Sequence, residues 1–290
     1  MATKPLDREG LILSKACLSQ ESVDAHLLRA RKIFHLSCFG FLMAHLGIRP
    51  GCLHGFMGTM GSGKSTVLKK IITESAEGAR CLVYLTEEKV EEFQAGINAI
   101  NSYAPVLANI RFIEQRSIRE EGRSIQYYRE GIERCVERTR PNILFIDNIA
   151  TSLFYGDHIP AWEQMKTIQW LVDMAKRLDV AIFYVAHTRK DVTDNMPRLF
   201  TPEDIRGSTM LPIQTEYFYT MQKFKGNTKQ YNVVQNCKHR HHDKASGFFL
   251  LHYDNGKYLK DTKILFDDVD KIFKERDQLG RRKKRNDDDF

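Results

Sequence analysis

Hydrophobic and polar positions follow two alternating patterns along the middle of the chain. Short β-branched or apolar runs predict five strands, and segments with apolar residues at helical spacing separate them. The predicted strands cover residues 53–56, 81–85, 110–113, 143–146 and 181–185, and the predicted helices cover residues 64–75, 89–101, 121–138 and 161–178. This alternation predicts an α/β fold with a mostly parallel sheet and helices on both faces.

The pattern changes on both sides of this central region. Residues 1–50 are expected to be helical, with Ser22 as an N-cap and Leu36–Leu46 as a buried helix too short to span a membrane. After residue 212 only strands follow, and the last two flank the tight-turn pair Asn255-Gly256. The predicted organisation is a helical N-terminal segment or intersubunit linker (1–50), a main domain (51–262) with an antiparallel C-terminal extension, and a charged tail (263–290).

Composition limits the cellular compartment and the class of binding partner that we expect. Hydrophobic residues make up 42% and charged residues 28%, as in an ordinary globular protein. The net charge of +7 suits a polyanionic partner, and it is equally compatible with a merely soluble basic surface. The six cysteines are scattered without a CxxC pair, which indicates reduced thiols. We therefore expect a cytoplasmic protein, in the host cytoplasm if it is phage-encoded, with no membrane partner.

Residues 58–65 match the pattern G-x-x-x-x-G-K-S between a predicted strand and a predicted helix, the context that a phosphate-binding P-loop requires. The glycines let backbone N–H groups point at phosphate oxygens. Lys64 is expected to reach the β- and γ-phosphates, and Ser65 to hold Mg²⁺. The expected ligands are ATP, or another NTP or dNTP, and Mg²⁺. The nucleotide-binding assignment covers Gly58, Thr59, Met60, Gly61, Ser62, Gly63, Lys64, Ser65 and Thr66.

Further polar side chains follow other predicted strands, and the carboxyl ends of parallel strands meet at one edge of a sheet. Asp147 is assigned to the nucleotide and Mg²⁺ site, although it could also cap the following segment. Glu87 is the candidate general base. His187 is expected to face the γ-phosphate, with a structural role as the alternative. The remaining acidic residues near Glu87 fit a solvated helix start: Glu88, Glu91 and Glu92.

Several of these segments occur together in a specific order. They are Leu85–Glu92, Ile146-Asp147, Ala186-His187, Asp204–Ser208 and Lys238–Arg240. In this order the chain resembles, over residues 50–260, the RecA-type motor domain of DnaB-like hexameric replicative helicases, in the phage helicase-primase and Twinkle branch. One departure is that Gln214, behind Pro212, lies one residue later than the family's glutamine.

The resemblance implies roles for residues that spacing alone leaves open. It makes Glu87 the catalytic base and His187 a γ-phosphate sensor. Lys238 and Arg240 would act on the nucleotide of a neighbouring subunit, where a guanidinium stabilises charge on the transferring phosphoryl group. Arg206 and Gly207 would contact DNA in a central channel. Without the resemblance, residues 238–242 read as a basic strand edge or a histidine cluster, and a metal site there lacks acidic or thiol ligands at suitable spacing.

The function expected from the resemblance is an NTP-driven helicase or translocase on single-stranded DNA, assembled as a homo-oligomer, most simply a hexameric ring. The alternative is a RecA- or KaiC-like ATPase switch that assembles on DNA or protein without unwinding. The C-terminal tip, Asp287–Phe290, resembles acidic tips that end in phenylalanine and dock on replication proteins. A polymerase or other replisome protein is therefore an expected partner, with a solubilising tail as the alternative.

Overall fold

The computed structural model describes residues 39–43, 47–156, 158–194, 196, 198–225, 230–240, 247–254 and 257–274. The predicted N-cap Ser22, most of the predicted N-terminal segment, the turn pair Asn255-Gly256 and the acidic tip lie outside these residues. Within the stretch predicted as a buried helix, α3 (Gly40–Met43) is helical, and Phe41 and Leu42 are buried.

A nine-stranded sheet forms the centre of the described residues, in the order β3-β2-β4-β5-β1-β6-β7-β8-β9. The parallel part confirms the five predicted strands: β1 (Leu53–Gly58), β2 (Cys81–Leu85), β3 (Ile110–Glu114), β4 (Ile143–Asp147) and β5 (Ala181–His187). Every residue of β1, β2, β4 and β5 is buried, which explains why these strands read as unbroken apolar runs.

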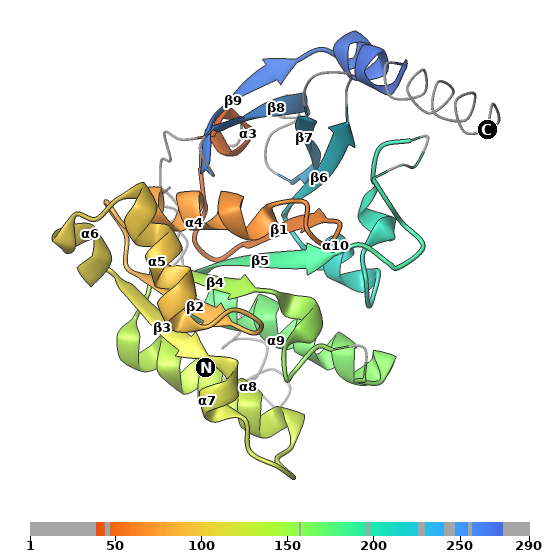
Figure 1. The fold of residues 1–290 in the computed structure, drawn as a ribbon. Coiled ribbons are helices and arrows are strands. Elements are labelled where there is room, and N and C mark those ends of the chain that lie inside the picture. The colour runs from red at the N-terminus through yellow and green to blue at the C-terminus, as the bar shows by residue number, and fades with distance from the viewer. Residues whose placement is uncertain are drawn as a thin grey trace, which may run out of the picture. The chain divides into compact units, whose positions relative to one another are not determined.

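Helices cover both faces of the parallel part, as the alternating pattern predicts (Figure 1). On one face, α4 (Lys64–Ser75) and α5 (Val90–Ile100) pack Val67, Ile71 and Phe93 into one apolar cluster. On the other, α8 (Ile125–Thr139) and α9 (Ala161–Leu178) pack Ile132 and Leu171 into a second. Short helices not anticipated from the pattern connect these elements: α6 (Ala104–Ala108), α7 (Gln115–Ile118), η1 (Ile149–Thr151), η2 (Pro202–Asp204) and α10 (Met210–Gln214).

The C-terminal strands extend the sheet as predicted. β6 (Tyr217–Lys225) lies parallel to β1, and β7 (Gln230–His239), β8 (Gly247–Asp254) and β9 (Lys257–Ile264) follow in antiparallel order. Beyond residue 262, the predicted end of the main domain, residues 266–274 form a helix that packs on the sheet. Val269 is buried there, and Phe273 meets Phe224 with ring centroids 4.9 Å apart.

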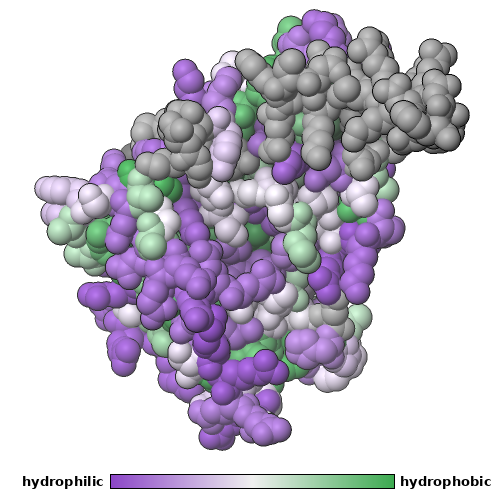
Figure 2. Space-filling model, in the orientation of Figure 1, coloured by the Kyte–Doolittle hydropathy of each residue, from purple (hydrophilic) through white to green (hydrophobic). Residues whose placement is uncertain are grey.

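The outer surface on the face drawn in Figure 2 is largely hydrophilic below the atoms drawn in grey. Among the described residues, no helix combines the length and the apolar character needed to cross a bilayer. The four cysteines in this part of the chain are free thiols: Cys52, Cys81, Cys135 and Cys237.

Candidate functional site

The P-loop joins the end of β1 to the start of α4, and two of its glycines, Gly63 and Gly58, are needed for different reasons. Gly63 caps α4 with a φ of 94°, in the left-handed region that disfavours side chains. At Gly58 the constraint is space, because a Cβ would lie 2.7 Å from the backbone oxygen of Met221 on β6. The start of the loop therefore lies tightly against β6, and its other end is the N-terminus of α4. Thr66 lies in the first turn of that helix.

Lys64 is folded back over this loop. Its Nζ donates a hydrogen bond of 2.5 Å to the backbone oxygen of Thr59, and its side chain is buried. Burial lowers the pKa of Lys64 to about 8, and the carboxylates of Asp147, Glu87 and Asp194 partly oppose this shift. A buried ammonium group whose described hydrogen bond goes to a backbone carbonyl is suited to gain a closer anionic partner, such as a phosphate.

Ser65 and Asp147 form the candidate cation site. Asp147 ends β4, is buried, and accepts a hydrogen bond from the Ser65 side chain. Burial raises the pKa of Asp147 to about 6, against the lowering effects of Ser65 and Lys64. A hydroxyl and a carboxylate side by side are oxygen ligands of the kind that Mg²⁺ prefers, and a divalent cation would offset the cost of the buried carboxylate. These residues therefore fit Mg²⁺.

Glu87 and Glu88 follow β2 and lie in different surroundings. The Glu88 carboxylate pairs with Lys69 of α4 at 2.7 Å, and Lys69 also lies over the Phe93 ring. Glu87 remains exposed, and its Oε1 lies 4.0 Å from Nε2 of His187. Of the two, Glu87 is the carboxylate that faces the ends of β4 and β5.

His187 is fixed in one tautomer by its neighbour Asn148. The Oδ1 of Asn148 accepts the backbone N–H of Thr151 at 3.0 Å, so its Nδ2 donates to Nε2 of His187 at 2.9 Å. The ring proton then lies on Nδ1, which has no partner within the described residues. Burial, followed by the charge of Lys64, lowers the pKa of His187 to about 4. His187 is thus neutral at neutral pH.

The segment that carries Arg206 and Gly207 is hydrogen-bonded to the end of β5. The backbone N–H of Arg206 donates to the oxygen of His187 at 2.8 Å, and the Arg206 charge contributes to lowering the pKa of His187. Gly207 has a φ of 102°, and a Cβ there would lie 3.0 Å from the ring of Tyr155. The phenol oxygen of Tyr155 accepts the N–H of Ser208 at 3.0 Å. Arg206 therefore lies beside the candidate catalytic residues.

Lys238 and Arg240 lie at the other end of the strands. β7 runs antiparallel to β6, and the backbone N–H of Arg240 donates to Glu216, whose Oε2 accepts the N–H of Leu53 at the start of β1. Nζ of Lys238 donates to the carbonyls of Pro212 and Ile213 in α10, 2.9 and 2.5 Å away, and Arg240 shares the carbonyl of Ile213. The length of β1 separates this edge from the P-loop by roughly 17 Å at 3.3 Å per residue.

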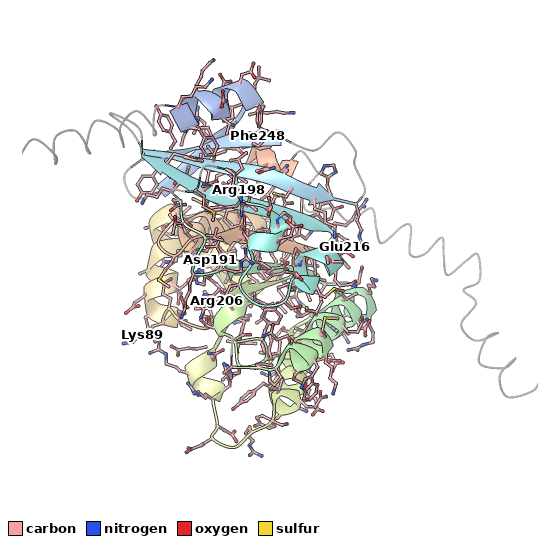
Figure 3. The ribbon with its side chains drawn as sticks, turned by 90° about the vertical axis from the view of Figure 1, so that its right-hand side faces the viewer. Lys89, Asp191, Arg198, Arg206, Glu216 and Phe248 are labelled. Carbon is pink, nitrogen blue, oxygen red and sulfur yellow. The ribbon has the colours of Figure 1, made fainter. Side chains whose placement is uncertain are left out.

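Two residues of this site escaped prediction. Asn148 directly follows the predicted Asp147, and its position after a buried strand was the signal available. Asp194, in the segment after β5, accepts a hydrogen bond from Thr59 of the P-loop at 2.8 Å. It belongs to no sequence motif that could have indicated this contact. Figure 3 labels Asp191, Arg198 and Arg206, which belong to the same segment.

A family model described as "AAA domain" matches residues 44–192, half of the chain. The chain belongs to the AAA domain family. The DNA repair protein RadA of Streptococcus pneumoniae is 26% identical over 156 residues, which are 53% of this chain and 34% of that protein. The match thus spans about a third of the relative's length, and both comparisons agree with a RecA-type P-loop ATPase domain.

The chemistry available to this AAA domain is nucleotide binding and phosphoryl transfer to water. Lys64 supplies positive charge at the P-loop, and His187, which pairs with Gly58, is a neutral side chain beside it. Glu87 can accept a proton from a water molecule at the same edge. Mg²⁺, which Ser65 and Asp147 would hold, neutralises charge on the phosphate oxygens when bound.

Proposed function

We propose that this AAA domain is an ATP-driven motor on single-stranded DNA, a DnaB-like helicase or translocase that works as a ring, most simply a hexamer. The observation that carries the proposal is the placement of Lys238 and Arg240 at the sheet edge opposite their own P-loop. Cations at that edge are too far from the phosphates bound in the same subunit, but they suit the nucleotide of a neighbouring one.

Single-stranded DNA as the substrate of the motor is supported by the net charge, by Arg206 and by the similarity to a DNA repair protein. The chain carries a net charge of +7, and the matched relative is a DNA repair protein. The backbone of Arg206 is hydrogen-bonded to His187. Contact of the Arg206 side chain with a DNA phosphate would therefore change the position of His187 at the hydrolytic site. The acidic tip at residues 287–290 remains our proposed contact for a polymerase or other replisome protein.

Changing Arg206 to alanine should weaken binding to single-stranded DNA. Loss of one phosphate contact should lower the slope of log K against log salt by about 0.7. Stimulation of hydrolysis by DNA should fall as well. Fluorescence anisotropy of a labelled oligonucleotide over a salt series measures the slope. Arg80→Ala is the matched control, because Arg80 is exposed and its guanidinium binds only the carbonyl of Arg140 among the contacts described. Equal slopes for Arg206→Ala and wild type would remove Arg206 from the DNA site.

The placement of Arg240 leads to a mixing experiment. Arg240→Ala alone should lose hydrolysis, because each nucleotide then lacks the cation of the neighbouring subunit. Lys64→Ala alone should lose it as well, because each subunit then lacks its own contact to the phosphates. Mixed subunits should recover activity, because some interfaces then pair an intact P-loop with an intact Arg240. Phosphate release measured across mixing ratios gives the result. If no ratio restores activity, Arg240 does not act between subunits.

The proposal as a whole is tested by hydrolysis with and without single-stranded DNA, together with particle mass in nucleotide. The motor hypothesis expects stimulation by DNA and a ring-sized particle. A forked DNA substrate then separates the motor from the second candidate, a RecA-like ATPase that assembles on DNA without unwinding it. The similarity to a DNA repair protein favours that second candidate, and a DNA-stimulated ATPase that fails to open the fork would support it.

A further inference from the structure

Asp194 bridges the P-loop and β6 with one carboxylate. Its Oδ2 accepts the hydroxyl of Thr59 at 2.8 Å, and its Oδ1 accepts the backbone N–H of Lys223 at 3.0 Å. Thr59 and Asp194 are 135 positions apart in the chain, and Thr59 is buried. The two oxygens of a single side chain therefore join the first turn of the phosphate-binding loop to a strand of the sheet.

The end of the β1–β6 ladder explains why an acceptor is needed there. The two strands pair in parallel up to Gly58 and Met221, after which the chain leaves β1 and turns into the P-loop. The N–H of Lys223, two residues further along β6, would lose its strand neighbour at this point. The carboxylate of Asp194 accepts this N–H in place of the missing strand, and its other oxygen accepts the hydroxyl of Thr59.

The segment that carries Asp194 is itself held in place. The Nε2 of Gln222 donates to the backbone oxygens of Asp194 and Arg198, 3.4 and 3.3 Å away. The guanidinium of Arg198 binds the buried carboxylate of Asp204 through two hydrogen bonds of 2.6 and 2.7 Å. These hydrogen bonds fix the position of the segment from which Asp194 reaches the P-loop.

Thr59 links this bridge to the lysine of the phosphate site. Its hydroxyl is held by Asp194, and its backbone oxygen is the acceptor for Nζ of Lys64. We propose that Asp194 is a positioning residue for nucleotide binding, which acts through Thr59 to fix the P-loop and the resting place of Lys64. The inference rests on the nucleotide-binding part of the proposed function and is independent of DNA and of ring assembly.

The test compares two substitutions of Asp194 with one of Asp191, an exposed aspartate of the same segment that faces Arg189 at 3.7 Å. Asp194→Ala should raise the KM for ATP about tenfold, the scale expected for losing hydrogen bonds to a charged group, with a smaller change in kcat. Asp194→Asn should restore most of the affinity, because its carboxamide oxygen can accept from Lys223 and its amide can donate to the Thr59 hydroxyl. Asp191→Ala should resemble wild type.

A double-mutant cycle separates positioning from a general loss of structure. In a Thr59→Val background, Asp194→Ala should change KM less than twofold, because the partner of the bridge is already gone. If Asp194→Ala does not fold, Thr59→Val alone tests the bridge, since it removes the same hydrogen bond and leaves the Lys223 contact, and it should raise the KM for ATP by a similar factor. Fully additive effects, or the same KM for Asp194→Ala and Asp191→Ala, would overturn the proposal. Full hydrolysis by Lys64→Ala would instead refute the nucleotide site itself.

Discussion

Lys64→Ala should abolish nucleotide hydrolysis while the protein stays folded. The side chain provides the only ammonium group that the described residues show folded over the P-loop, and its removal leaves the phosphates without that charge. Burial lowers the pKa of Lys64 to about 8, so at neutral pH the ammonium form is less favourable in the folded protein than in the unfolded chain. Its loss should therefore cost no stability from charge.

Phosphate release and thermal unfolding followed by circular dichroism measure the two parts of this expectation. Lys70→Ala is the matched control on the same helix, because Lys70 pairs with Glu74 at 2.6 Å. That variant should hydrolyse ATP at close to the wild-type rate. Retention of hydrolysis by Lys64→Ala would show that residues 58–65 are not the phosphate site.

Glu87→Gln should bind nucleotide and hydrolyse it about a hundredfold more slowly, the scale associated with loss of a general base. The amide keeps the size of the side chain but cannot take a proton from water. Because Glu87 is exposed and, among the described residues, its carboxylate approaches only His187 at 4.0 Å, folding should be unaffected. Single-turnover hydrolysis and binding of a fluorescent ATP analogue separate the chemical step from affinity.

Glu88→Gln is the control that fixes the register of the catalytic carboxylate. The Glu88 carboxylate is engaged by Lys69, so its replacement should leave most of the hydrolysis in place. An inactive Glu88→Gln beside an active Glu87→Gln would move the general base by one residue.

The parallel sheet was predictable because its strands are buried on both faces. Each of these strands is therefore an unbroken apolar run that stands out from its helical neighbours. The meeting of Lys64, Asp147 and His187 at one edge followed from the shared direction of parallel strands. The P-loop followed from its glycine spacing, although the reason for Gly58, its contact with β6, needed the structure.

The contacts that sequence reasoning missed depend on the path of irregular segments. Asp194 reaches Thr59 because residues after β5 fold over the end of β6, and no periodicity encodes that path. The orientation of Asn148 is set by Thr151 in a short 3₁₀ helix. Residues 266–274 were included in the predicted charged tail, yet Val269 and Phe273 provide an apolar side that fits against the sheet.

The strand order separates the strand that carries the P-loop from the strand that carries Glu87. Between β1, which carries the P-loop, and β2, which carries Glu87, lie β4 and β5, so the two ends are three strand spacings apart, roughly 14 Å at 4.8 Å each. The Glu87 side chain crosses most of this width, because its Oε1 lies 4.0 Å from Nε2 of His187, and His187 pairs with Gly58 at the start of the P-loop. A shift of β2 relative to β1 would therefore move the candidate base away from the phosphate site without disturbing the P-loop itself.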